Sequence, residues 1–130
     1  MSSNVLVEIV QALYSAMATG DTTVYDTSLH ADFRVVESPA LPFGGTFHGM
    51  EGFNSLVGQI FEMYSEFVPS PKSFAVGDNC VMVEVDIRLT GKATGKTIDT
   101  QLIEVFKFVD DKLIEIRPFY FDSDLLASIL

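Results

Sequence analysis

The spacing of the apolar residues changes halfway along this chain of 130 residues, and the change restricts the folds that it can adopt. In residues 5–17 apolar side chains recur every three or four positions, which predicts one face of a helix. In residues 81–89 they alternate with polar side chains, which predicts a strand with one buried face. Helices followed by a run of strands are typical of an α+β domain with helices on one face of a curved sheet.

The first part of the chain predicts a helical hairpin and a strand. We expect the first helix to end at Thr19-Gly20, and Asp21 suits the N-cap of a second, short helix. A strand is expected over residues 33–37. Residues 38–49 are rich in proline and glycine, which predicts a loop that contains one short strand at residues 46–48.

A third helix and an antiparallel meander complete the predicted fold. Apolar residues recur at helical spacing from Phe53 to Tyr64, and we expect Pro69 and Pro71 to end this helix. The turn between the last two strands is expected at Asp110-Asp111. The expected strands cover residues 74–76, 81–89, 97–108 and 112–121. The length predicts one domain over residues 1–130.

The composition argues against several kinds of partner. Eighteen acidic and eight basic side chains give a formal net charge of -10, which repels nucleic acid and anionic membranes. The single Cys80 rules out an internal disulfide and fits a reducing compartment. No apolar run reaches about 18 residues, so we predict a cytoplasmic protein without a membrane span. Metal-ligand spacings and nucleotide-binding glycine motifs are also absent from the sequence, so we expect no metal and no cofactor.

One carboxylate stands inside an otherwise apolar strand. Glu104 is flanked by Leu102 and Phe106, and a buried ionisable group is costly unless it is paired, protonated or used. If Glu104 faces a pocket, desolvation raises its pKa and allows it to donate or shuttle a proton. The alternative is a structural carboxylate that pairs with an arginine or a lysine.

Further candidates lie near the expected pocket. Asp122 and Tyr120 could supply a base and a hydrogen-bond donor, whereas Asp122 could instead cap a terminal helical turn. His48 precedes the long helix and would titrate near neutral pH if exposed, or it is a surface residue of a turn. Tyr14 lies on the apolar stripe of the first helix, where its hydroxyl needs a partner if it is buried. Core or lining roles without individual chemistry are expected for Met17, Phe53, Phe61, Phe106 and Phe119.

Several short sequence words resemble a known family. They are Gly20-Asp21, residues 33–39 (FRVVESP), residues 47–52 (FHGMEG), residues 104–108 (EVFKF) and residues 112–116 (KLIEI). Together they resemble the SnoaL-like and ketosteroid isomerase-like families of the nuclear transport factor two-like superfamily. The resemblance implies a cone-shaped fold, in which a curved antiparallel sheet wraps around a long helix and leaves a mostly apolar pocket open at one end.

The resemblance also implies roles for single residues. The general base of the isomerase pattern falls at Ser38, with Glu37 one residue earlier, and a shift of one residue reverses the face of a strand. Glu37 therefore does not simply inherit that role, and the sequence leaves open which of the two faces the pocket. Glu104 falls at the position of a protonated acid, and Tyr14 lies within one residue of a phenol donor. The inward face of the last strand is implied for Ile114, Ile116, Pro118, Tyr120 and Asp122.

Two functions follow as hypotheses. The first is a cofactor-independent enzyme that isomerises or cyclises a small apolar carbonyl compound, with Glu104 as acid or shuttle, Tyr14 as polarising donor and Asp122 or His48 as base. The second is a module of the same fold that binds a ligand or a protein without turnover. A homodimer through the outer face of the sheet is expected as well, because an inward Glu104 turns its strand neighbours outward.

Overall fold

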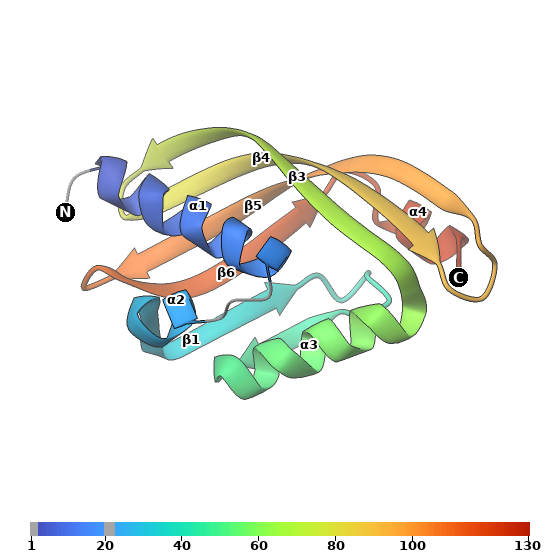
Figure 1. Ribbon diagram of the computed structural model, residues 1–130, viewed down its shortest axis with the longest axis horizontal. Helices are drawn as coiled ribbons and strands as arrows, with labels where there is room; N and C mark the ends of the chain where they lie inside the picture. The colour runs from blue at the N-terminus through green and yellow to red at the C-terminus, as the bar shows by residue number, and fades with distance from the viewer. Residues whose placement is uncertain (1–2, 20–22) are drawn as a thin grey trace.

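The chain folds into a six-stranded curved sheet with helices against one face (Figure 1). The structure is a computed structural model that describes residues 3–19 and 23–130. The α+β class is confirmed. The expected helix stop at Gly20 and the cap at Asp21 lie outside the described residues. The elements are α1 (Ser3–Thr19), α2 (Thr23–Ser28), β1 (Leu29–Glu37), β2 (Gly45–His48), α3 (Gly49–Met63), β3 (Tyr64–Gly77), β4 (Cys80–Gly91), β5 (Thr97–Val109), β6 (Lys112–Tyr120) and α4 (Ser123–Ser128).

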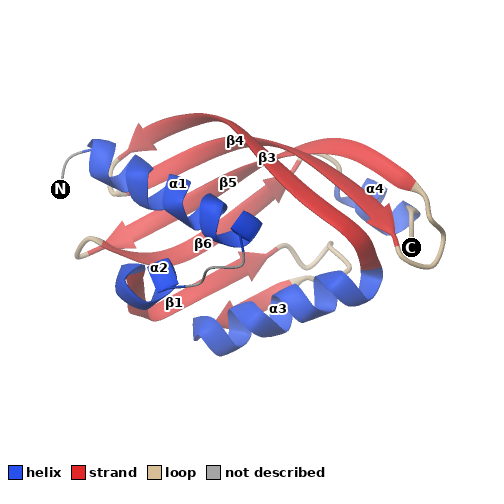
Figure 2. Ribbon diagram, viewed as in Figure 1, coloured by secondary structure: helices blue, strands red, loops and turns tan. Residues whose placement is uncertain are grey.

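The strand order of the sheet is β2-β1-β6-β5-β4-β3. Neighbouring strands are antiparallel except for β1 and β6, which run parallel with Val35 opposite Ile116. The sheet is therefore mixed, whereas the sequence led us to expect an antiparallel one. A parallel neighbour requires a long connection, and the chain between β1 and β6 supplies it with a helix and four strands. Figure 2 shows α1 lying across the sheet and α3 along its lower edge, beside β1.

The end of α3 differs from the prediction. The helix ends at Met63, and Pro69 and Pro71 lie within the next strand, β3, instead of ending the helix. A strand tolerates proline at the edge of a sheet, where the missing N–H faces solvent, and β3 is an edge strand. The chain turns directly from helix to strand at Tyr64, which is fully buried and donates a hydrogen bond of 2.6 Å to the carbonyl oxygen of Leu126.

The inward face of the sheet forms the main core. In β4 the alternating residues are buried as the period of two predicts, while their neighbours face away from the helices. The predicted turn at Asp110-Asp111 joins β5 to β6, and both residues have positive φ, 51° and 63°, as a tight hairpin turn requires. The buried residues of β4 are Val81, Val83, Val85, Ile87 and Leu89.

Candidate active-site pocket

A cavity of about 80 Å³ lies between the inward face of the sheet and the helices α1, α2 and α3. Most of its lining is apolar. The polar groups that reach it come from five side chains, each on a different element of the fold: Tyr14, Tyr25, Glu37, Glu104 and Tyr120. An enclosed apolar site with a few convergent polar groups is the usual form of a small-molecule site.

Tyr14 and Glu104 form a hydrogen-bonded pair in this cavity. The hydroxyl of Tyr14, on α1, donates to Oε1 of Glu104, on β5, at 2.7 Å. Burial raises the pKa of Glu104, and the hydrogen bond from Tyr14 only partly offsets this effect. Burial and the neighbouring Glu104 also raise the pKa of Tyr14. The ring of Tyr14 meets that of Phe106 edge to face, with centroids 5.8 Å apart, so packing holds the phenol in place.

Glu37 is the second carboxyl group of the pocket. Its side chain is 4% exposed, and its Oε1 atom has no hydrogen-bond partner among the described residues. Burial and the nearby Glu104 raise the pKa of Glu37 to about 8. Glu37 is therefore mainly neutral at pH 7, and burial raises the pKa of Glu104 as well.

The structure answers which of the two residues at the end of the first strand faces the pocket. Glu37 lines it, whereas the hydroxyl of Ser38 accepts a hydrogen bond of 3.2 Å from the backbone N–H of Ala40 in the following turn. The strand parity could have revealed this arrangement. Phe33 and Val35 are apolar and buried, and Glu37 continues their alternation on the same face.

Tyr120 lies at the end of β6 and adds a third phenol near the two acids. Burial raises its pKa, as do the nearby Glu37 and Glu104. Its ring packs edge to face against Phe43, with centroids 6.1 Å apart. Of the other residues expected in the core or lining, the pocket includes Met17, Phe53, Phe106 and Ile116. The expectation was wrong for Phe119, which is 54% exposed because the alternation of β6 turns it to the opposite face from Pro118 and Tyr120.

Four predicted site residues lie away from this pocket: Ser38, His48, Phe61 and Asp122. The carboxylate of Asp122 accepts a hydrogen bond of 3.2 Å from the backbone N–H of Leu125, so it caps α4 as the alternative prediction stated. His48 is exposed at the N-cap position of α3. Phe61 is 48% exposed, because the stripe of α3 that faces the pocket ends at Ile60.

The inward face of β6 is shorter than the resemblance implied. Pro118 lines the pocket together with its neighbours Ile116 and Tyr120, whereas Ile114 and Asp122 do not. The pairing of β5 with β6 is irregular between Lys107 and Phe108, which changes the register next to Ile114. Asp122 follows the end of the strand.

A structural carboxylate with several cations does exist, but it is Glu115 and not Glu104. Glu115 is 2% exposed, and its oxygens lie 3.0 Å from Arg34 Nη2, 3.5 Å from Lys107 Nζ and 3.2 Å from Arg117 Nε. Burial pushes its pKa up, but the hydrogen bond and charge of Arg117 and the charges of Lys107 and Arg34 lower it overall. The alternation of β6 places Glu115 on the opposite face from the pocket.

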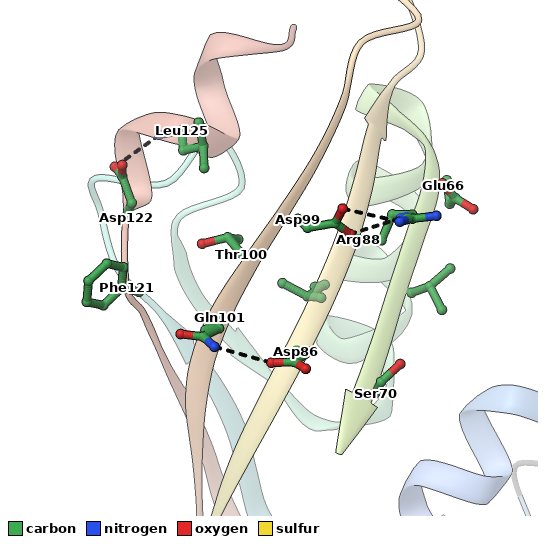
Figure 3. A pocket seen from close by; sticks show the side chains of 12 residues that line it. Glu66, Ser70, Asp86, Arg88, Asp99, Thr100, Gln101, Phe121, Asp122 and Leu125 are labelled. Atoms are coloured by element: carbon green, nitrogen blue, oxygen red, sulfur yellow. Dashed lines mark hydrogen bonds and ion pairs between the residues drawn. The ribbon is translucent and has the colours of Figure 1, made fainter. Parts of the chain in front are cut away.

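A larger hollow of about 820 Å³ lies on the outer face of the sheet, beside α4 (Figure 3). It is open, and polar groups in its lining bind one another: Arg88 binds Asp99 at 2.9 Å, and Gln101 donates to Asp86 at 3.4 Å. No buried acid without a partner lies among its described lining residues. We therefore place the candidate chemistry in the smaller, enclosed pocket, where the two raised pKa values and the unpartnered oxygen coincide.

The described residues contain no group of three acidic, histidine or cysteine side chains that could hold a metal ion. None of the helices seen in residues 3–19 and 23–130 is both long and apolar enough to cross a membrane. The pocket residues themselves can carry out proton transfer, because they include two carboxyl groups with raised pKa and three phenols.

Comparisons with known proteins agree with this architecture. Residues 10–116 match the family model described as the SnoaL-like domain. A nuclear transport factor two-like protein of unknown function from Burkholderia pseudomallei has a similar structure, with a TM-score of 0.86, 19% identity and coverage of 99% of this chain and 98% of that chain. A comparison with curated proteins found no match.

Two other similar structures carry a functional description. One is a proposed SnoaL-like polyketide cyclase from Jannaschia sp. CCS1, with a TM-score of 0.79, 17% identity and coverage of 98% of this chain and 92% of that chain. The other is a proposed isomerase from Rhodopseudomonas palustris, with a TM-score of 0.68, 19% identity and coverage of 97% and 96%. Likeness at these identities establishes the fold alone.

Proposed function

Because the chain belongs to the SnoaL-like domain family, we propose that its pocket moves a proton on a small, mainly apolar carbonyl compound, in an isomerisation or cyclisation without a cofactor. The observation that carries this proposal is the meeting of two carboxyl groups with raised pKa, the buried Glu37 and the half-buried Glu104, in one apolar cavity. The descriptions of similar structures as a proposed cyclase and a proposed isomerase point in the same direction.

Glu37 is the base in this proposal, in place of Asp122 and His48. A pKa of about 8 lies close to neutral pH, where a general base combines a useful ionised fraction with a strong affinity for the proton. Its free Oε1 atom is available to a substrate C–H group beside a carbonyl. The ionised carboxylate takes that proton, and the electron pair of the C–H bond moves to the carbonyl oxygen as the enolate forms.

Glu104 and Tyr14 stabilise the enolate. Protonated Glu104 donates a hydrogen bond to the enolate oxygen, and the hydroxyl of Tyr14, 2.7 Å from Glu104 Oε1, supports the same charge. In an isomerisation Glu37 then returns its proton to another carbon of the substrate, and the enolate electrons form the new C–H bond. In a cyclisation the enolate carbon attacks a second carbonyl group of the same substrate, and the new alkoxide takes a proton from Glu37.

A second function is a pocket that binds a ligand without turnover. The apolar lining with a few convergent polar groups favours it, because such a lining binds a small molecule whether or not a reaction follows. The cavity volume of about 80 Å³ is far below the roughly 300 Å³ at which typical ligand pockets begin. Substrates larger than a few heavy atoms would therefore require the helices to move.

Deuterium exchange separates the two functions. Small ketones and enones are incubated with the protein in D₂O, and exchange beside the carbonyl is followed by NMR. The wild type is expected to accelerate exchange, with a rate that rises towards pH 8 and then levels off, while Glu37→Gln abolishes the acceleration and the exposed control His48→Gln preserves it. Equal exchange by the wild type and a folded Glu37→Gln protein would reject Glu37 as the base.

A homodimer through the outer face of the sheet is part of the proposal. Met82 is paired with Val105 across β4 and β5, and Ile103 is paired with Phe119 across β5 and β6. Of these side chains, Met82, Ile103 and Phe119 are 40–54% exposed. This apolar patch is a suitable interface for a second copy of the chain. Arg117, opposite Val105 in β6, and the exposed Glu84 flank the patch with opposite charges that can meet across a two-fold axis.

A further inference from the structure

The described lining of the pocket contains acidic side chains but no basic side chain. Its lining holds Glu37 and Glu104, and none of its described lining residues is a lysine, an arginine or a histidine. The cations nearest in the sheet, Arg34, Lys107 and Arg117, belong to the opposite face, where they bind Glu115. Burial and the nearby Glu104 raise the pKa of Glu37.

The unpartnered oxygen of Glu37 points to a missing donor. Glu37 is only 4% exposed, yet its Oε1 atom has no hydrogen-bond partner among the described residues. A buried polar atom without a partner is costly, and such atoms are rare in folded proteins. A ligand with an N–H group that reaches Glu37 would satisfy it.

The remaining walls favour a cation over an anion. Aromatic rings line the cavity on several sides, and the face of an aromatic ring attracts a positive charge. The formal net charge of -10 also draws cations to the protein and repels anions. The aromatic lining residues are Tyr14, Tyr25, Phe53, Phe67, Phe106 and Tyr120.

We propose that this pocket selects small apolar compounds that carry a protonated amine, with the ammonium group bound to Glu37, and that it rejects carboxylates of the same shape. The inference deepens the proposed function by assigning an amine to its carbonyl substrate, and it rests on that function only for turnover. When the ammonium group binds, Glu37 releases its proton to solvent and becomes a carboxylate. Glu104 stays protonated beside Tyr14, because two adjacent carboxylates repel each other.

The test uses three probes with one carbon skeleton: isobutylamine, isobutanol and isobutyrate. Binding is measured by calorimetry at pH 7, in two buffers that differ in their heat of ionisation. We expect the amine to bind at least tenfold more tightly than the alcohol and the carboxylate not to bind. A group with a pKa of about 8 is about 90% protonated at pH 7, so amine binding should release about 0.9 proton.

Variants assign the preference to a residue. Glu37→Gln should abolish both the preference for the amine and the proton release but keep the affinity for isobutanol. Glu62→Gln removes the same charge from the exposed face of α3 and should change neither result. Thermal unfolding checks that each variant is folded. Should Glu37→Gln fail to fold, Glu37→Asp provides the test, since its shorter carboxyl group should weaken binding of the amine while keeping the affinity for isobutanol.

Several outcomes would overturn the inference: isobutyrate that binds as tightly as isobutylamine, amine binding without proton release, or a folded Glu37→Gln protein that still prefers the amine. The proposed function fails separately. Amine-selective binding without deuterium exchange beside the carbonyl would support the amine site and reject the enzyme. Deuterium exchange on neutral ketones without a preference for amines would support the enzyme and reject the amine site.

Discussion

The hydroxyl of Tyr14 donates a 2.7 Å hydrogen bond to Glu104 and so ties the first helix to β5 across a distance of 90 residues in the sequence. The bond closes one side of the pocket and fixes the orientation of an acid whose pKa burial raises. Folding stability and the proposed chemistry therefore both depend on this pair.

Tyr14→Phe should lower the free energy of unfolding by about 1 kcal/mol, because a buried hydrogen bond is lost and the ring packing is kept. Chemical denaturation of Tyr14→Phe, Glu104→Gln and the double variant measures the coupling between the two residues. A coupling energy close to zero would mean that the bond contributes nothing to folding.

Stability should fall as the pH rises, because of Glu37. Its pKa is near the ordinary value of 4.5 in the unfolded chain and about 8 in the folded protein, so the folded state binds the proton more tightly. The contribution of Glu37 to the free energy of unfolding is fully present below pH 4.5 and is lost as the pH rises to 8. The free energy of unfolding should fall by at most ~1.4 kcal/mol per pH unit in this range. The difference in unfolding free energy between the wild type and Glu37→Gln, measured from pH 4 to pH 9, reports this residue alone. A difference that does not depend on pH would contradict the raised pKa.

Glu115→Gln should destabilise the protein by about 2 kcal/mol, less than a fully buried ion pair because the three cations around it are partly exposed. The sign of the pH dependence is opposite to that of Glu37. The pKa of Glu115 is lowered, so its contribution is present above the unfolded pKa and is lost as the pH falls. Asp99→Asn breaks the exposed pair with Arg88 and serves as the control, for which we expect no measurable change. Equal unfolding midpoints for Glu115→Gln and Asp99→Asn would contradict a special role for Glu115.

Asp122→Ala should lower the free energy of unfolding by about 1 kcal/mol, because Asp122 caps α4. It should leave the rate of deuterium exchange beside the carbonyl unchanged, because Asp122 does not line the pocket. Denaturation curves and the NMR exchange assay, run on the same preparation, check both parts. A loss of exchange with normal stability would restore Asp122 as a candidate base.

Phe119→Asp should convert the proposed dimer to a monomer, since a charge in the middle of the apolar patch would be buried without a partner. Light scattering at micromolar concentration gives the mass directly. Phe61→Asp, at a side chain of similar exposure on α3, should leave the dimer intact. A wild-type mass equal to one chain would reject the dimer itself.

The sequence predicted the order and type of the elements well, because the helical and strand periods are both regular. It placed the end of α3 wrongly, since Pro69 and Pro71 stop a helix and also fit an edge strand, and nothing local indicates which strand lies at an edge. The parallel pairing of β1 with β6 likewise depends on contacts between distant segments.

The candidate site was predicted less completely. Glu104 stood out because its apolar neighbours made a carboxylate costly, and Tyr14 because a buried phenol needs a partner. The choice between Glu37 and Ser38 was left open because the resemblance pointed to Ser38, although the alternation of Phe33 and Val35 already indicated the face of Glu37. Asp122 had two roles open to it, and only the geometry of α4 distinguishes capping from chemistry.

The two prolines of β3 also restrict how molecules of this protein can join. An exposed edge strand usually offers a row of N–H and C=O groups to which the strand of another molecule can add, and repeated addition produces fibres. Proline has no N–H, so Pro69 and Pro71 interrupt that row along the outer side of β3. Growth of one continuous sheet through many molecules is thereby blocked at this edge, and the apolar residues on the face of the sheet can stay exposed with less risk of aggregation.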